Sequence, residues 1–293
     1  MERRMIVCDL DGTLLDSRGE LSERTRAAVR RVRADGHVFV VATARPVRDT
    51  RHLVAGLNDA PGTTGTTGTA NATGTTDVTG TTGTTGTANA TIAVCGNGSV
   101  VYDFARDEVV DHHPLAEADV VTALTALRER FPGIRLGAEC HLELLLEDAF
   151  ELAPALAGDA RRVPRLEEAI DRHGVGKIMV QLEGAARQYY ESVGVLLPGC
   201  EVTVSADVFC EVTRAGVTKA AALEAMAGRL GFGRAGVIAF GDMPNDLPML
   251  TWSGTAVAVA NAHPAVLAVV HEVTASNDDD GVAVWLERLS EKH

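Results

Sequence analysis

The sequence lacks paired cysteines, an excess of basic charge and long hydrophobic runs. Its five cysteines are odd in number and include no Cys-x-x-Cys pair, which argues against a disulfide framework or a thiolate zinc site. Asp and Glu number 40 against 27 Lys and Arg, and the formal net charge of −13 opposes general binding to nucleic acid or anionic lipid. The longest apolar region, 256–270, is interrupted by Asn261, His263 and Pro264. We therefore expect a cytoplasmic protein that binds neither nucleic acid nor membranes.

Aromatic residues and lysine are also scarce, whereas aliphatic residues are plentiful. Hydrophobic residues make up 46% and aromatic residues 4% of the 293 residues, enough to bury the core of one or two domains, and this excludes a wholly disordered chain. The chain has three lysines, Lys177, Lys219 and Lys292. A lysine beside a chemical motif therefore carries more weight here than in a lysine-rich protein.

Short apolar runs rich in β-branched residues predict the strands of a sheet. They lie at 5–8, 37–42, 92–95, 236–240 and 256–260, and helical patterns cover 21–36 and 218–231. Strands alternating with helices are typical of an α/β protein with a parallel sheet. A polar cluster directly follows each run. Because ligands bind beyond the carboxyl ends of such strands, we expect these clusters to meet at one crevice.

Two segments depart from this pattern. Residues 100–210 carry shorter strand-like runs, and we interpret them as an α+β domain inserted into the first domain, which would consist of 1–99 and 211–293. Residues 62–91 are almost entirely Gly, Thr, Ala and Asn and contain GTTGTTGTANAT twice. We expect a low-complexity, mobile surface loop there, and the repetition also fits a recent repeat expansion or a sequencing artefact.

Two carboxylates follow the first apolar run, in Asp9-Leu10-Asp11-Gly12-Thr13. Acidic residues often cap helices or fill turns, but that role does not explain a pair beside an apolar strand. Gly12 gives the backbone the freedom that a tight exit from the strand requires. The arrangement suits nucleophilic catalysis, in which one carboxylate attacks phosphorus while its neighbour donates and then recovers a proton.

A second acidic cluster, GDMPND at 241–246, follows the fourth apolar run. At the sheet edge its carboxylates would meet those of the first cluster and a phosphate dianion. Each pair of charges would repel by about 4 kcal/mol at about 4 Å and an effective dielectric constant near 20. A divalent cation would offset this repulsion, and oxygen ligands with a phosphate partner indicate Mg²⁺.

These motifs together resemble those of the haloacid dehalogenase-like (HAD) phosphohydrolases, specifically the Cof-type branch with a C2B cap. DLDGT at 9–13 is similar to the family's first motif, the region of Thr43 to its second, the lysine of GVTK at 216–219 to its third, and GDMPND to its fourth. The resemblance covers nearly the whole chain outside 62–91. It implies a Rossmann-like parallel-sheet α/β core with an inserted α+β cap of the C2B type.

The resemblance also implies roles for the acidic residues. Asp9 would be the nucleophile that forms an aspartyl-phosphate, and Asp11 would be the general acid and then the base for the hydrolytic water. Mg²⁺ would be held by an Asp9 carboxylate oxygen, the Asp11 backbone carbonyl and Asp242. Asp246 would support this metal site.

Six residues are expected on the substrate side: Thr43, Ala44, Arg45, Asn97, Lys219 and Asn245. Thr43 and Lys219 would bind phosphoryl oxygens, although the sequence also allows an ordinary strand-end hydroxyl and a solvated helix residue at these positions. Ala44 stands where the second motif commonly has glycine. Asn97 follows the third apolar run and could equally be a turn asparagine.

The function that follows is a Mg²⁺-dependent phosphomonoesterase acting on a small phosphorylated metabolite, with sugar phosphates first by family habit. Two alternatives remain open, a phosphomutase of the same fold and a non-catalytic protein that binds phosphate ligands. A dehalogenase is disfavoured because it needs neither a second carboxylate at Asp11 nor a Mg²⁺ cluster. Neither the substrate nor the oligomeric state can be read from the sequence.

Overall fold

The computed structural model describes residues 2–57, 92–140, 142–153, 157–158, 160–172, 174–206 and 208–291. The low-complexity segment expected at 62–91 lies outside these residues. No helix in the described part of the chain is long and apolar enough to cross a membrane.

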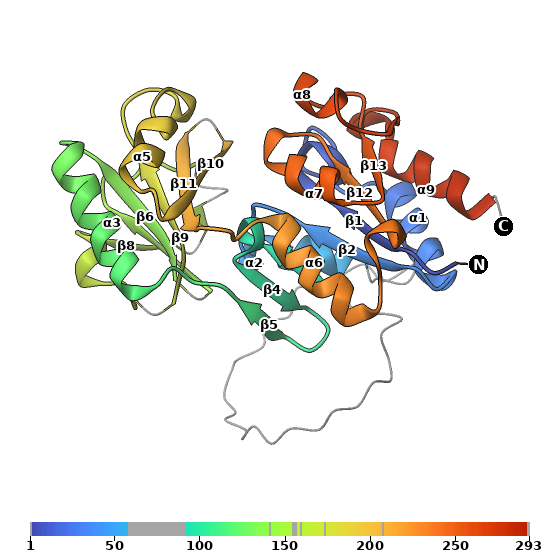
Figure 1. The fold of residues 1–293 in the computed structure, drawn as a ribbon, viewed down its shortest axis with the longest axis horizontal. Coiled ribbons are helices and arrows are strands. Elements are labelled where there is room, and N and C mark those ends of the chain that lie inside the picture. The colour runs from blue at the N-terminus through green and yellow to red at the C-terminus, as the bar shows by residue number, and fades with distance from the viewer. Residues whose placement is uncertain are drawn as a thin grey trace, which may run out of the picture.

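The larger of two sheets has eight strands in the order β14-β13-β12-β1-β2-β3-β4-β5 (Figure 1). The run from β14 to β3 is parallel, and β4 and β5 are added antiparallel. The strands are β1 (Met5–Cys8), β2 (Val38–Ala42), β3 (Ile92–Cys95), β4 (Val100–Asp103), β5 (Glu108–His112), β12 (Val237–Gly241), β13 (Thr255–Ala258) and β14 (Glu272–Val273). The five apolar runs therefore form parallel strands, as predicted.

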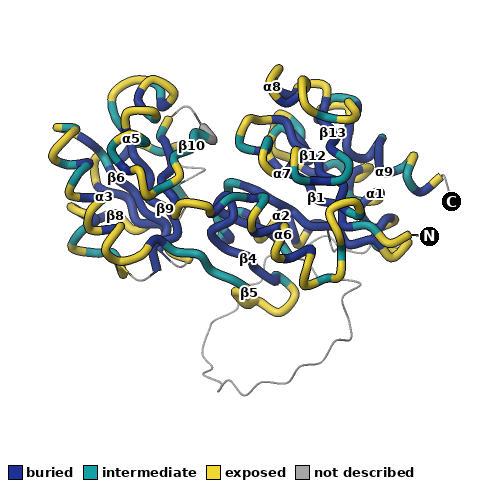
Figure 2. Tube along the Cα trace, in the orientation of Figure 1, coloured by how far each residue is buried: buried dark blue, intermediate teal, exposed yellow. Residues whose placement is uncertain are grey.

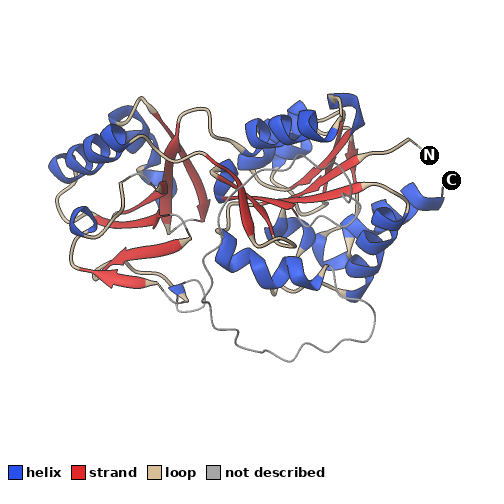
Figure 3. Ribbon diagram, turned by 90° about the horizontal axis from the view of Figure 1, so that it is seen from below, coloured by secondary structure: helices blue, strands red, loops and turns tan. Residues whose placement is uncertain are grey.

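Helices cover both faces of this sheet (Figure 3). Because both faces are covered, every residue of β1, β2 and β12 is buried, which explains why these strands are continuous apolar runs (Figure 2). The Ser22 side chain caps the first helix by accepting the Thr25 N–H. The helices are α1 (Glu23–Ala34), α2 (Val47–Gly56), α6 (Lys219–Leu230), α7 (Leu247–Trp252), α8 (Pro264–Leu267) and α9 (Gly281–Glu291).

The second sheet has six strands in the order β10-β11-β9-β6-β7-β8. Helices α3 (Glu117–Arg130) and α5 (Tyr190–Leu196) share a hydrophobic core with one face of it. The strands are β6 (Arg135–Cys140), β7 (Glu143–Glu147), β8 (Arg161–Val163), β9 (Val175–Gln181), β10 (Cys200–Ala206) and β11 (Phe209–Arg214). The chain enters this part after β5 and leaves it before α6 (Figure 1). The predicted fold class, a parallel-sheet α/β core with an inserted α+β cap, is confirmed.

The two sheets do not divide the chain at residues 100 and 210, where we expect the cap to begin and end. Residues 100–103 and 108–112 form a hairpin that extends the larger sheet, because β4 pairs antiparallel with β3. At the other end β11 continues to Arg214 in the cap sheet. The sequence patterns of short strands do not show which sheet they join, so the domain boundaries stay a prediction.

Candidate active site

Asp9 leaves the end of β1 in the middle of the larger sheet. Its backbone N–H donates to the Phe240 carbonyl at 3.0 Å, which continues the pairing of β1 with β12 by one residue. The chain then turns through Leu10–Leu14, where Gly12 has a φ of 75°. An ideal Cβ at Gly12 would lie 2.5 Å from Asp242 Oδ2, so this position needs glycine for its backbone conformation and for space.

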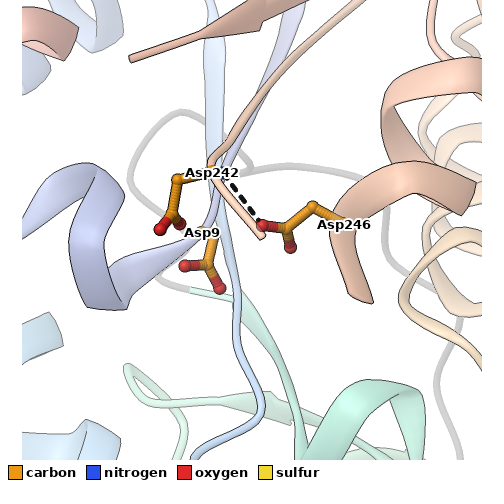
Figure 4. A group of neighbouring side chains, drawn as sticks. All are labelled: Asp9, Asp242 and Asp246. Atoms are coloured by element: carbon orange, nitrogen blue, oxygen red, sulfur yellow. Dashed lines mark hydrogen bonds between the residues drawn. The ribbon is translucent and has the colours of Figure 1, made fainter. Parts of the chain in front are cut away.

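Three buried carboxylates meet at this edge of the sheet (Figure 4). Ligand atoms of Asp9, Asp242 and Asp246 all lie within 4.8 Å of one another. Lys219, whose side chain is 1% exposed, places Nζ 2.6 Å from Asp9 Oδ1 and 2.7 Å from Asp246 Oδ1. Lys219 is the first residue of α6, which begins after the cap. The single ammonium therefore joins residues that are far apart in the sequence.

Asp246 differs from the other two carboxylates because both of its oxygens are engaged by the protein. Oδ1 accepts from Lys219, and Oδ2 accepts the backbone N–H groups of Asp242 and Met243 at 3.1 Å each. Asp242 Oδ1 accepts from the Thr13 hydroxyl at 2.7 Å. Within the described residues, Oδ2 of Asp9 and Oδ2 of Asp242 receive no hydrogen bond. Asp246 therefore positions the loop, whereas Asp9 and Asp242 each keep one oxygen for a ligand.

Burial sets the electrostatics of this cluster. It raises the pKa of Asp9 well above its ordinary value, with the Lys219 ammonium opposing the rise. Burial also raises the pKa of Asp242 to about 6, against a lowering effect of the Thr13 hydrogen bond. Burial alone would lower the pKa of Lys219, but Asp246 and Asp9 raise it above its ordinary value. The cluster is therefore short of positive charge.

A divalent cation fits this shortage and this donor set. Hard oxygen ligands suit Mg²⁺, and the absence of a side chain at Gly12 leaves room next to Asp242 Oδ2. The residues that could hold the ion are Asp242 through its unengaged oxygen, Asp9 through one carboxylate oxygen and Asp11 through its backbone carbonyl.

Asp11 lies two residues beyond Asp9, and its side chain is 54% exposed. Arg45 binds it in a bidentate ion pair, with Nε 2.8 Å from Oδ2 and a terminal nitrogen 2.5 Å from Oδ1. The Asp11 carboxylate raises the pKa of this guanidinium. Both side chains line the same cavity as Asp9, which has a volume of about 270 Å³.

The second-motif loop follows β2 and is held to the loop after β3. Thr43 N–H donates to the Val94 carbonyl, Gly96 N–H to the Arg45 carbonyl and Asn97 N–H to the Thr43 carbonyl. The Thr43 side chain is fully buried, and its hydroxyl oxygen accepts the Arg45 N–H at 3.0 Å. The loop thus fixes the backbone from which Arg45 reaches the cavity.

The structure separates the predicted site residues into two groups. The residues that line the cavity are Asp9, Asp11, Ala44, Arg45 and Asn245. Lys219 and Asp242 are buried beside Asp9, and Thr43 is buried behind Arg45. The structure does not bring Asn97 to the cavity. Its left-handed backbone, with a φ of 57°, turns the side-chain amide to Glu211 Oε2 at 3.0 Å.

Three charged cavity residues of the cap were not anticipated from the sequence: Glu139, Lys177 and Glu211. We call them the charged triad. Lys177 Nζ lies 2.6 Å from Glu211 Oε1 and 3.4 Å from Glu139 Oε1, and it donates to the Ala44 carbonyl at 3.2 Å. The sequence feature that could have identified them is Lys177, one of only three lysines, in an otherwise apolar strand.

Comparisons with known proteins agree with this fold. A family model described as haloacid dehalogenase-like hydrolase matches residues 6–286. The chain is 27% identical over 297 residues to the 5-amino-6-(5-phospho-D-ribitylamino)uracil phosphatase YitU of Bacillus subtilis (strain 168), covering 97% of this chain and 96% of that protein. It is similar in fold to a haloacid dehalogenase-like hydrolase from Bacteroides thetaiotaomicron, with a TM-score of 0.77, 24% identity and coverage of 98% and 100% of the two chains. A sugar phosphatase of the HAD subclass IIB is also similar in fold, with a TM-score of 0.74, 20% identity and coverage of 98% and 99%.

Proposed function

Because the chain belongs to the haloacid dehalogenase-like hydrolases and is a phosphatase of that family, we propose that it hydrolyses phosphate monoesters of small metabolites with Asp9 as the nucleophile and Mg²⁺ as the cofactor. The observation that carries this proposal is the geometry of Asp9. One carboxylate oxygen is held by Lys219, and the other receives no hydrogen bond from the described residues and belongs to a side chain that lines the cavity. A carboxylate held in this way is oriented for attack on phosphorus.

Each step assigns a role to a residue of the cavity. Asp9 attacks the phosphorus atom and forms an aspartyl-phosphate, while Asp11 donates a proton to the leaving oxygen. Asp11 then takes a proton from the water that hydrolyses the aspartyl-phosphate. For the first step Asp11 must hold a proton, so its ion pair with Arg45 must open when the substrate binds.

The cations of the site stabilise the transferring phosphoryl group. Arg45 and Lys219 supply positive charge, and the Thr43 hydroxyl and the Asn245 amide supply hydrogen bonds to the phosphoryl oxygens. Bound Mg²⁺, held by Asp9, the Asp11 carbonyl and Asp242, would neutralise charge that develops on the phosphoryl oxygens. Asp246 keeps Lys219 and the 241–243 backbone in place.

The test is phosphate release from p-nitrophenyl phosphate and a panel of metabolite phosphates, with Mg²⁺ or EDTA, by the natural protein and by Asp9→Asn. The proposal predicts turnover that requires Mg²⁺ and disappears in the variant. Turnover that survives in Asp9→Asn would refute the assigned nucleophile. Activity that depends on a bisphosphate activator would instead indicate the phosphomutase considered from the sequence.

A further inference from the structure

The charged triad lies where the cap sheet meets the core. Two chain connections join the cap to the core, one after β5 and one before α6 (Figure 1), so the remaining contacts decide how the cap sits on the core. In the cap sheet, Lys177 of β9 is paired with Glu139 of β6, and Glu211 of β11 is paired with Met179, two residues along β9 from Lys177. Because paired residues and residues two apart on a strand share a face, the three charged side chains lie on one face of the cap sheet.

The Lys177 ammonium is surrounded by protein acceptors. Its Nζ lies 2.6 Å from Glu211 Oε1, 3.4 Å from Glu139 Oε1 and 3.2 Å from the Ala44 carbonyl oxygen. An ammonium has three N–H groups, and these three acceptors match them. The Lys177 side chain is 3% exposed. Although Lys177 lines the cavity, its donors therefore serve the protein rather than a substrate.

Glu211 makes a second contact between the cap and the core. Its Oε1 accepts from Lys177, and its Oε2 accepts from the Asn97 amide at 3.0 Å. Asn97 follows β3, and its backbone N–H donates to the Thr43 carbonyl at 3.0 Å. We call Lys177, Glu211 and their two core partners, the Ala44 carbonyl and the Asn97 amide, the cap bridge. The cap bridge therefore reaches the second-motif loop twice, once directly and once through Asn97.

The second-motif loop carries two of the residues that we assign to the phosphoryl group. Ala44 lies between Thr43 and Arg45, and the Thr43 hydroxyl oxygen accepts the Arg45 N–H at 3.0 Å. A shift of the Ala44 peptide would therefore move both neighbouring side chains. Such groups need close positioning, since a misplacement of about 1 Å can cost about a hundredfold in rate.

The cap bridge is charged and buried, which suits a positioning role better than a stabilising one. Burial alone would lower the pKa of Lys177, but Glu139 and Glu211 raise it, so the ammonium is charged at neutral pH. A buried ion pair adds little net stability, because both charges lose their hydration. A hydrogen bond from an ammonium to a carbonyl is nevertheless among the stronger ones in proteins. The bridge therefore gives the Ala44 carbonyl a fixed position.

We propose that Lys177 and Glu211 are positioning residues, which reach from the cap to hold the second-motif loop in the geometry that binds the phosphoryl group. This inference rests on the proposed phosphatase function, in which Thr43 and Arg45 bind phosphoryl oxygens. It gives the cap a part in phosphoryl binding without a direct contact to the phosphoryl group. Because the bridge acts through the loop, its loss weakens the binding of every phosphate ligand, including inorganic phosphate, which has no leaving group.

The experiment measures the Kd of inorganic phosphate by isothermal titration calorimetry with Mg²⁺ present. Lys177→Met/Glu211→Gln removes one ammonium and one carboxylate together, so the net buried charge is unchanged. We expect the Kd to rise at least about tenfold. A change that only lowers the fraction of folded protein would reduce the number of binding sites and leave the Kd as it was.

A milder variant and a matched control complete the set. In Glu211→Gln the side chain keeps an acceptor at only one of the two positions that face Lys177 and Asn97, so the Kd should rise at least about threefold even if the double variant does not fold. The control is Arg128→Met/Glu147→Gln, which removes another ion pair of the cap. Within the described part of the chain, the hydrogen-bond partners of these two side chains all belong to the cap. The control should leave the Kd unchanged.

Turnover of p-nitrophenyl phosphate and glucose 6-phosphate, measured alongside, separates the inference from the function on which it rests. A raised Kd in the bridge variants with an unchanged Kd in the control supports the inference. An unchanged Kd in the bridge variants overturns it, even where kcat/KM for glucose 6-phosphate falls, because the two residues would then act on the leaving group or on stability alone. A Kd that rises equally in the control also overturns it. No Mg²⁺-dependent hydrolysis of either ester by the natural protein refutes the proposed function, whatever the Kd values are.

Discussion

Lys219→Met should destabilise the protein strongly, and by an amount that depends on pH. The ammonium lies between the buried carboxylates of Asp9 and Asp246, at 2.6 and 2.7 Å. Methionine keeps most of the side-chain length and removes the charge. The two carboxylates then lose the cation that they share.

The magnitude follows from the geometry. Removing one partner of a buried ion pair typically costs about 3–5 kcal/mol. Oxygens of Asp9, Asp242 and Asp246 lie within 4.8 Å of one another, so each pair of charges also repels by about 3 kcal/mol at an effective dielectric constant near 20. We expect the free energy of unfolding to fall by about 3–5 kcal/mol at pH 7 without Mg²⁺. The loss should be smaller at pH 5, because burial raises the pKa of Asp9 and its protonation removes one of the two negative charges that Lys219 faces.

Urea unfolding followed by circular dichroism measures this loss at both pH values, with EDTA or Mg²⁺. The control is the double variant Lys219→Met/Asp246→Asn, in which the carbonyl oxygen of the introduced amide can still accept from the two backbone N–H groups that Asp246 Oδ2 now accepts. The double variant has one buried negative charge fewer than Lys219→Met, so it should regain part of the stability at pH 7. A loss below about 1 kcal/mol, or a double variant less stable than the single one, would contradict the assigned role of Lys219.

Three further predictions concern the same edge of the sheet. Gly12→Ala should raise the Mg²⁺ concentration for half-maximal activity by about tenfold, whereas Gly19→Ala, with a similar φ of 78° and nothing within 4 Å of its Cβ, should not. Because the pKa of Asp242 is raised to about 6, the folded metal-free protein holds this proton more tightly than the unfolded chain does. The contribution of Asp242 to the stability in EDTA, measured against Asp242→Asn, should therefore decrease as the pH rises from about 4 to about 6, and a contribution that rises over this window would be inconsistent with it. Arg45→Gln should raise KM for phosphate esters by about ten- to a hundredfold, and an unchanged KM would exclude Arg45 from substrate binding.

The sequence predicts the core of the fold because the parallel strands are buried on both faces. Residues 5–8, 37–42 and 236–240 therefore read as apolar runs, and the acidic residues that follow two of them meet at one edge. The sequence does not show that the hairpin at 100–112 joins the larger sheet, because partner choice among short antiparallel strands depends on tertiary contacts that a local pattern does not contain.

The cap side of the cavity is less accessible to sequence reasoning. Which face of the cap sheet meets the core depends on how the chain crosses between the two sheets. Side chains alternate along a cap strand in the same way whichever face meets the core, so the sequence pattern does not identify that face. The side-chain partners of Asn97 depend on this packing as well. Its amide meets Glu211, which is 114 residues away in the sequence.

The most direct test of Asp9 as the nucleophile is to trap the phosphoryl group on it. Asp11→Asn lacks the proposed base for hydrolysis, whereas p-nitrophenyl phosphate has a leaving group that departs without a general acid. We predict that acid quenching of this variant with Mg²⁺ and p-nitrophenyl phosphate yields one phosphoryl group per chain, located by mass spectrometry on the peptide that contains Asp9. The double variant Asp9→Asn/Asp11→Asn should carry none. Release of nitrophenol with no phosphoryl group on Asp9, or with one on another residue, would contradict the proposed mechanism.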